Sequence, residues 1–246
     1  YKGILFRRTY PELQDMIIRA KQIYMSVVPR VRWNEKFTQF TFPSGAVIRF
    51  RHLEYQGDET RYQGHEYQYI AFDELTHFRE EQYLYLLSRC RTVFPELRCY
   101  VRAATNPGGP GHGWVKARFI DPTRSGEHPY VDPKTGLTRY FIPARVQDNP
   151  YLMKADPDYM KRLELLPEIQ KKMLLYGDWD VFAGQIFTEW DRGAHVIEHP
   201  TDLPKSWPRW KALDWGFAKP YCCLWFAVDY DDQVIVYREL YGWTGK

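Results

Sequence analysis

The chain has 246 residues, 44% hydrophobic and 26% charged, so it is long and apolar enough to bury a full core and is not a disordered tail. Its 34 Lys and Arg against 31 Asp and Glu leave a formal net charge of +3, which is too near balance to indicate an anionic partner by long-range field alone. No apolar run is long enough to cross a bilayer, residues 1–10 lack the apolar region of a signal peptide, and four cysteines without CxxC spacing favour reduced thiols in a cytosol.

Neither end of the sequence resembles a natural terminus. The chain opens on Tyr1 and runs at once into a strand pattern, and it closes on Lys246 shortly after another one. We therefore expect an internal segment of a longer protein, in which missing motifs count for less than usual.

The first part of the chain predicts alternating strands and helices. Pro11 and Glu12 follow the first apolar run and favour a helix start, and Pro43-Ser44-Gly45 separates two alternating stretches as in a hairpin. The expected elements are a strand at 3–8, a helix at 10–26, hairpin strands at 37–42 and 46–51, a buried strand at 69–72, a helix at 80–91 and a strand at 98–105.

The second part changes character. An exposed loop is expected at 121–136, and a helix or helix pair at 148–177 with Leu163, Leu166, Ile169, Met173 and Leu174 as its apolar stripe. Residues 184–205 read as a connector, and strands at 211–215, 222–229 and 234–240 form a meander. Because alternation gives way to a meander, we predict two domains, at 1–180 and 208–246, joined by a connector at 181–207.

The most informative segment is the buried strand that ends in two acids, Asp73 and Glu74. Acids at the exit of a central strand lie at the ligand-binding edge of a sheet. There Asp73 can bind Mg²⁺ and Glu74 can activate the water that attacks a γ-phosphate. The alternative is a strand capped by two solvated acids, because short apolar runs that end in acids are common.

A second strand ends in Thr105 and Asn106, about thirty residues further on. This places a hydroxyl and an amide at what should be the same sheet edge, where such groups can sense a γ-phosphate or hold an attacking water. The alternative is a Gly- and Pro-rich loop in which Asn is favoured for its turn chemistry.

A set of motifs in fixed order covers nearly the whole chain. They are RYQGHEYQYIAFDEL at 61–75, RCR at 89–91, ATNPGG at 104–109, His112, WVK at 114–116, DNP at 148–150, GDW at 177–179 and LDWG at 213–216. Together they resemble the large terminase subunit of tailed bacteriophages. That family is the ATP-driven motor that packages viral DNA into a procapsid.

The resemblance implies an α/β fold: a P-loop NTPase sheet of the ASCE type followed by the first strands of an RNase H-like nuclease that cuts concatemeric DNA. It implies that Asp73 is the Walker B acid that binds Mg-ATP, that Glu74 is the catalytic carboxylate, and that Thr105 and Asn106 belong to the coupling motif. The implied cofactors are ATP and Mg²⁺, with Mg²⁺ or Mn²⁺ at the nuclease site.

The resemblance also implies partners and a location. The partners are double-stranded DNA, the small terminase subunit, the portal protein and further copies of the chain in a homo-oligomeric ring, without a membrane. The location is the host cell cytoplasm, docked at the procapsid portal during packaging.

The sequence departs from the family pattern at the phosphate loop. No GxxxxGK[ST] motif is present, so we expect the Walker A strand and loop to precede Tyr1, and the segment alone to bind ATP poorly or not at all. Arg61 is the candidate arginine finger, although Gln63 stands where the family often carries an arginine. Arg7 and Arg8 are alternatives, and each of the three also fits a surface arginine.

In the second domain, Asp214 interrupts an apolar strand. An RNase H-like nuclease uses such an acid to bridge two metals, and the resemblance therefore makes Asp214 a metal ligand. One Asp cannot hold two metals, so further acids are expected beyond Lys246, with Glu239 better suited to a structural role. The alternative for Asp214 is a buried, hydrogen-bonded carboxylate.

Basic residues cluster loosely in two groups, and a motor could use them to bind DNA phosphates. Most of them also fit the solvent-exposed faces of helices. The groups are Lys116, Arg118 and Arg124, and Lys154, Lys161, Arg162, Lys171 and Lys172. Two other functions remain open: a different P-loop helicase or translocase ATPase, and an inactive DNA-binding or assembly module. In isolation the segment should show neither ATPase nor nuclease activity.

Overall fold

The computed structural model of the chain describes residues 1–181, 192–197, 203–216 and 220–242. It divides into two compact units, Tyr1–Thr188 and Glu189–Lys246, and each is described by itself. Most of the connector predicted at 181–207 lies outside the described residues. The assignment of 1–180 to an ATPase and of 208–246 to a nuclease stays a prediction.

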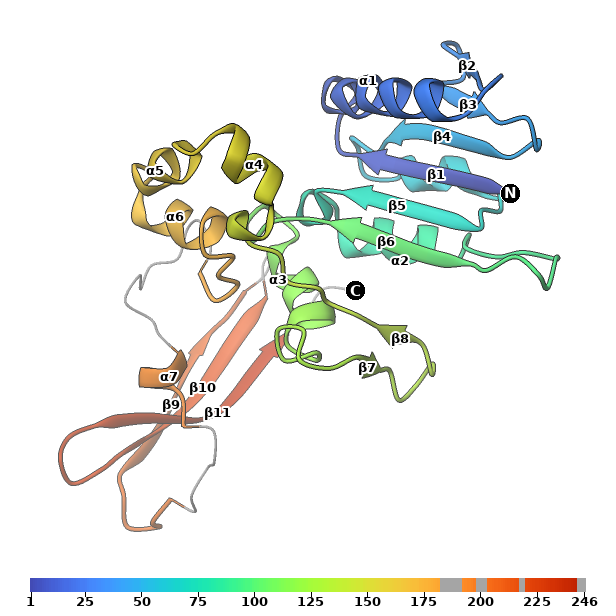
Figure 1. The fold of residues 1–246 in the computed structure, drawn as a ribbon. Helices are drawn as coiled ribbons and strands as arrows, with labels where there is room; N and C mark the ends of the chain where they lie inside the picture. The colour runs from blue at the N-terminus through green and yellow to red at the C-terminus, as the bar shows by residue number, and fades with distance from the viewer. Residues whose placement is uncertain (182–191, 198–202, 217–219, 243–246) are drawn as a thin grey trace. The chain divides into compact units, whose positions relative to one another are not determined.

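The first unit is built on a six-stranded sheet in the order β2-β3-β4-β1-β5-β6 (Figure 1). The strands are β1 (Lys2–Arg7), β2 (Arg32–Asn34), β3 (Gln39–Thr41), β4 (Val47–His52), β5 (Tyr69–Asp73) and β6 (Tyr100–Ala104). Strands β4, β1, β5 and β6 run parallel, whereas β2 and β3 are antiparallel. The strand predicted at 69–72 is therefore central, with a parallel neighbour on each side.

Helix α1 (Tyr10–Val27) covers one face of β1 and β4. It begins where the sequence predicts, because Pro11 occupies the first turn and Glu12 Oε2 accepts a hydrogen bond from the backbone N–H of Thr9 at 3.0 Å. Leu13 and Ile17 pack against buried aromatic side chains of β3 and β4, which closes the smaller of the two cores.

The opposite face of the sheet carries the larger core. Ile4 and Phe6 of β1 and Ile70 and Phe72 of β5 are at most 2% exposed and pack against α2 (Glu80–Leu87). Strand β1 also places Leu5 against the α1 side, and a strand covered on both faces reads as a continuous apolar run.

The helix predicted at 80–91 ends earlier, at Leu87. The backbone of the next residues pairs with Tyr67 instead: Tyr67 N donates to Arg89 O and Arg91 N donates to Tyr67 O, each at 3.0 Å. A parallel bridge to a distant residue thus replaces the last helical turn.

Short elements complete the first unit. They are η1 (Asp58–Tyr62), η2 (Leu75–His77), α3 (His112–Val115) continuing into the π-helical turn η3 (Lys116–Ile120), β7 (Tyr130–Val131), β8 (Thr138–Arg139), η4 (Val146–Asp148), α4 (Pro150–Ala155), α5 (Tyr159–Glu164) and α6 (Glu168–Leu174). The loop predicted at 121–136 therefore contains one strand of a small hairpin.

The region predicted as a helix or helix pair at 148–177 forms three short helices instead, because Pro157 and Pro167 interrupt the pattern. The predicted apolar stripe is confirmed in part. Met173 is buried, and Leu163, Leu166 and Ile169 are half-buried. Leu174 is 40% exposed, whereas the neighbouring Leu175, which the stripe left out, is 1% exposed.

The second unit contains the predicted meander. Strands β9 (Arg209–Asp214), β10 (Tyr221–Val228) and β11 (Val234–Gly242) form an antiparallel sheet in the order β11-β10-β9, preceded by α7 (Arg192–His195). Within the described ranges, no helix is both long and apolar enough to pass through a bilayer.

Candidate functional site

Two strand ends meet at one edge of the first sheet. Asp73 is the last residue of β5 and pairs in register with Ala104, the last residue of β6. Glu74 then leaves the sheet with φ 54° and ψ 62°, in the left-handed region that non-glycine residues rarely adopt. Such a conformation costs about 1–3 kcal/mol and persists where the surroundings hold it, most often at functional sites.

Arg7 lies beside Asp73. It ends β1, the other neighbour of β5, and its Nε is 2.7 Å from Asp73 Oδ2. The Asp73 side chain is 32% exposed, so the carboxylate is paired with one cation and still open to solvent. Its hard oxygens fit a Mg²⁺ ion that keeps several of its waters.

Thr76 links the two strand ends. Its backbone N–H donates to Thr105 Oγ1 at 3.1 Å, the two hydroxyl oxygens are 2.9 Å apart, and Thr76 Oγ1 lies 3.3 Å from the carbonyl oxygen of Asn106. Thr76 is 2% exposed, and the sequence pattern did not single it out. Its only signal is its place two residues after the acidic pair. The predicted meeting of the two strand ends is confirmed.

The loop after β6 continues along the turn after β5. Gly111 N donates to Thr76 O at 2.7 Å, and Trp114 Nε1 donates to Phe78 O at 2.9 Å. A Cβ added to Gly111 would lie 2.5 Å from Phe78 O and 2.6 Å from Trp114 Nε1, so only glycine fits this position. The segment 105–114 is therefore hydrogen-bonded to Thr76 and Phe78 near its start, at Gly111 and at its end.

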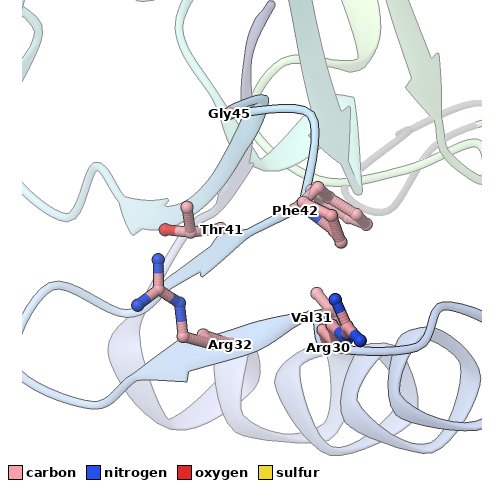
Figure 2. Close-up of a pocket in the computed structure, with 7 residues that line it drawn as sticks. Arg30, Val31, Arg32, Thr41, Phe42 and Gly45 are labelled. Carbon is pink, nitrogen blue, oxygen red and sulfur yellow. The ribbon is translucent and has the colours of Figure 1, made fainter.

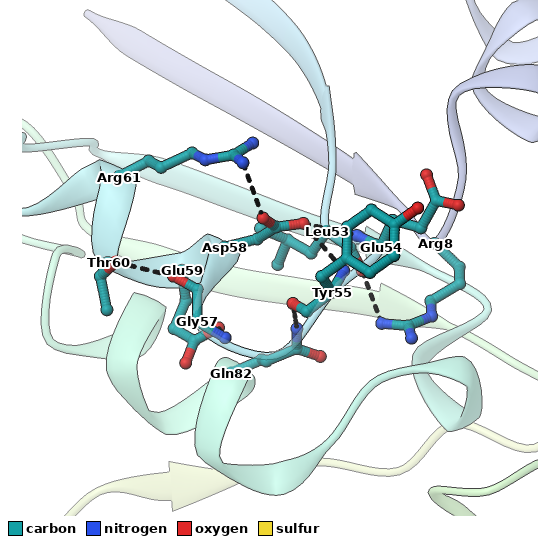
Figure 3. A network of polar contacts seen from close by, with 10 residues as sticks. All are labelled: Arg8, Leu53, Glu54, Tyr55, Gly57, Asp58, Glu59, Thr60, Arg61 and Gln82. Atoms are coloured by element: carbon teal, nitrogen blue, oxygen red, sulfur yellow. Dashed lines mark hydrogen bonds and ion pairs between the residues drawn. The ribbon is translucent and has the colours of Figure 1, made fainter.

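Arg61 lies elsewhere, on η1 (Figure 3). Its Nη2 is 3.1 Å from Asp58 Oδ1, and its side chain is 71% exposed. Asp58 is buried and accepts hydrogen bonds at 2.9 Å from the backbone N–H groups of Glu54 and Tyr55. Within the part of the chain that the structure describes, no contact joins Arg61 to Asp73 or Glu74.

The two alternative arginines differ in their partners. Arg7 is paired with Asp73, as described above. Arg8 instead donates from Nη1 to Leu53 O at 2.7 Å, which gives it a structural role at the end of β4 (Figure 3).

In the second unit, Asp214 ends β9 opposite Cys222 and is exposed. The buried-carboxylate alternative is therefore wrong. Glu239 pairs with Leu224, two residues along β10, so both acids share one face of the sheet. Burial raises the pKa of the Cys222 thiol, and the charges of Glu239 and Asp214 raise it further. Across the described residues, no group of three or more His, Cys, Asp or Glu side chains is placed to hold a metal ion, and Asp214 and Glu239 alone do not suffice for a two-metal site.

Most of the basic residues that could grip DNA are already paired with carboxylates. The pairs are Lys116 with Asp180, Arg118 with Glu80, Lys161 with Asp158, Arg162 with Asp156, and Lys171 with Glu168 and Glu164. Arg124, Lys154 and Lys172 have no carboxylate partner among the residues that the structure describes. Because these carboxylates neutralise most of the positive charge nearby, the two groups offer little net positive charge to DNA.

An open cavity of about 430 Å³ lies on the hairpin side of the sheet (Figure 2). It is lined by Arg30, Val31, Arg32, Thr41, Phe42, Pro43 and Gly45. These residues adjoin the start of β4, whereas Asp73 stands at the carboxyl ends of the parallel strands. The cavity is therefore separate from the acidic edge.

Solved structures similar to this chain include several of one phage protein. The large terminase from a thermophilic bacteriophage matches with TM-score 0.56 and 18% identity, over 98% of this chain and 55% of that chain. Its complex with ADP gives TM-score 0.55 at 19% identity, and its complex with ATP-gamma-S gives 0.53 at 19%, over 98% of this chain and 55% and 54% of those chains. At these identities the likeness shows the fold alone.

The chain spans about half the length of the terminase structures that it matches. A comparison with curated protein sequences finds no match. A family model described as terminase large subunit, T4likevirus-type, N-terminal, matches residues 2–192, which is most of the chain. With the fold and the paired strand ends in place, this match shows that the chain belongs to the terminase large subunit family.

Proposed function

We propose that this chain is part of a viral DNA-packaging motor that hydrolyses ATP to drive double-stranded DNA into a procapsid. The observation that carries the proposal is the edge at which Asp73 and Glu74 leave a central parallel strand and the next turn is hydrogen-bonded to Thr105. Family membership makes ATP the substrate of choice, and the terminase of the thermophilic phage binds ADP and ATP-gamma-S.

Each residue of the edge then has a role. Asp73 holds Mg²⁺, which when bound neutralises charge on the phosphates. Glu74 orients the attacking water and takes up its proton. Arg7 keeps a positive charge beside Asp73. Thr105 and Asn106, joined to the turn after Glu74, relay the state of the site to the rest of the unit.

Two further groups complete the site. The 246 residues contain no GxxxxGK[ST] motif, so the phosphate loop comes from another part of the full-length protein. Arg61 serves as the arginine finger of a neighbouring subunit in a ring, which agrees with its 71% exposure and its anchor at Asp58.

The second unit begins an RNase H-like nuclease that cuts concatemeric DNA with two Mg²⁺ or Mn²⁺ ions. Asp214 is one metal ligand, and residues outside the described ranges supply the others. The small terminase subunit and the portal protein are the partners during packaging, in the cytoplasm of the host.

Asp73 provides the experiment that tests the proposed metal role. In the full-length protein, Asp73→Asn should raise the Mg²⁺ concentration needed for half-maximal ATP hydrolysis by about tenfold or more, because one carboxylate leaves the metal's environment. Asp15→Asn, at an exposed position of α1, is the matched control and should leave the Mg²⁺ dependence unchanged. An unaltered Mg²⁺ titration in Asp73→Asn would contradict the assignment.

A further inference from the structure

His112 is a buried histidine to which the proposed mechanism gives no role. It is 7% exposed, and both ring nitrogens lie within hydrogen-bond distance of backbone groups. Nδ1 accepts from the N–H of Gly108 at 2.9 Å, so the proton stands on Nε2, which donates to Trp179 O at 3.1 Å. Burial lowers the pKa of His112, which favours this neutral form.

The backbone groups that face the two ring nitrogens belong to segments far apart in the chain. Gly108 lies in the loop that begins at Thr105 and has φ 103°, and a Cβ there would lie 3.2 Å from Met173 Sδ of α6. Trp179 is 8% exposed and stacks on the imidazole with ring centroids 5.3 Å apart. The histidine therefore stands between the loop after β6 and the last described residues of the first unit.

Neighbouring residues also contact the segment at Trp179, one from η3, which follows α3, and one from the chain after β8. Lys116, one turn after His112, has its Nζ 2.5 Å from Asp180 Oδ1. Phe141 packs edge-on against Trp179, with ring centroids 6.1 Å apart. A displacement of the loop at Gly108 must therefore disturb the segment at Trp179 unless the histidine releases one of its partners, because closely packed groups shift together.

We propose that His112 is a positioning residue that ties the loop 105–111 to residues 179–181 and so transmits rearrangements at the Asp73–Glu74 edge to the segment that continues toward the second unit. The inference rests on the proposed function of that edge. It adds one specific residue that links the two segments, with Nδ1 bonded to Gly108 and Nε2 bonded to Trp179.

Two substitutions separate hydrogen bonding from packing in the full-length protein. His112→Phe keeps a ring against Trp179 but removes both nitrogens, which leaves the buried N–H of Gly108 without its acceptor. His112→Gln keeps one acceptor and one donor at a similar separation. His65→Phe is the matched control, because His65 also stacks on an aromatic ring, that of Tyr67, but is exposed and does not touch the loop.

Three readouts are measured together: kcat and KM for ATP, the length of DNA moved per ATP, and amide hydrogen exchange of residues 105–111. For His112→Phe we expect kcat and the DNA moved per ATP to fall about five- to tenfold, KM to stay within about twofold, and exchange of Gly108 to speed up. His112→Gln and His65→Phe should behave as wild type. If His112→Phe fails to fold, His112→Asn, whose side chain is too short to reach both partners, must show the same fall in kcat and in DNA moved per ATP with KM nearly unchanged.

Normal turnover, normal DNA movement and protected exchange in the variant that lacks both nitrogens would overturn the inference. A uniform loss in the Phe and Gln variants would also overturn it, since it would indicate packing alone. Failure of the proposed function is distinguishable, because the wild-type protein itself would then lack ATP turnover while the exchange experiment would still report the loop.

Discussion

The carboxyl edge of the first sheet and the acidic face of the second are built differently. At the first, parallel register brings Asp73 and Ala104 side by side, and Thr76 and Thr105 join the two following loops through hydrogen bonds of 2.9–3.1 Å. At the second, Asp214 is an exposed residue of an antiparallel meander, with Glu239 the other carboxylate on its face.

This difference indicates that the described residues form most of the site in the first unit but only part of the site in the second. Parallel strands deliver their ends to one edge, so groups from three segments meet there without further elements. In an antiparallel meander, the carboxyl ends of neighbouring strands lie at opposite edges of the sheet. A site on such a sheet therefore needs groups from additional strands or helices. Substitutions in the first unit should therefore disturb a connected structure, whereas substitution of Asp214 should remove a charge and little else.

The largest expected effect on stability is at Gly111. A methyl group there collides with backbone and indole atoms at 2.5–2.6 Å, so Gly111→Ala must displace the loop and should lower the free energy of unfolding by about 3 kcal/mol. The measurement is urea unfolding of the full-length protein, together with ATP turnover.

Gly113→Ala is the control for this prediction. Gly113 lies two residues further along, in α3, and a Cβ there has no atom within 4 Å. Alanine should therefore be neutral or slightly stabilising. Equal unfolding free energies for the two variants would contradict the close fit of the loop at Gly111.

A smaller loss is expected when the link between the strand ends is cut. Thr105→Val keeps the shape of the side chain but leaves the buried N–H of Thr76 without an acceptor, which costs about 1–3 kcal/mol of stability. Chemical denaturation measures it. Thr138→Val, at an exposed position of β8, should change stability by less than about 0.5 kcal/mol. A Thr105 variant as stable as this control would show that the hydroxyl does not hold the two loops.

The smallest effect on stability should come from Asp214→Asn, at less than about 0.5 kcal/mol, because the side chain is exposed. The same variant of the full-length protein should lose DNA cleavage and keep ATP hydrolysis. Plasmid cutting and phosphate release measure the two activities. Loss of both, or a large loss of stability, would mean that Asp214 supports the fold rather than a metal.

Local signals in the sequence were sufficient for several elements. The apolar run before Asp73 predicted a central strand, Pro11 and Glu12 predicted the start of α1, and turn residues predicted the meander. Chain order also predicted that Asp73 and Thr105 would share an edge, because they stand at the carboxyl ends of two strands that pair in parallel.

Features that depend on contacts between residues far apart in the sequence were not predicted. The pairing of Arg7 with Asp73 requires β1 to lie next to β5, and the end of α2 at Leu87 requires a bridge to Tyr67. The role of Thr76 follows only from its contact with Thr105. Likewise, pairing of lysines and arginines with carboxylates cannot be read from the positions of the basic residues alone.

The central claim is that the Asp73–Glu74 edge hydrolyses ATP, and Glu74→Gln tests it most directly. In steady-state assays of the full-length protein at saturating Mg-ATP, we predict that this variant loses about 10²–10⁴-fold in kcat while it still binds nucleotide, because only the group that accepts the proton has changed. Glu81→Gln, an exposed position of α2, should hydrolyse ATP at the wild-type rate. Wild-type turnover in Glu74→Gln would contradict the account.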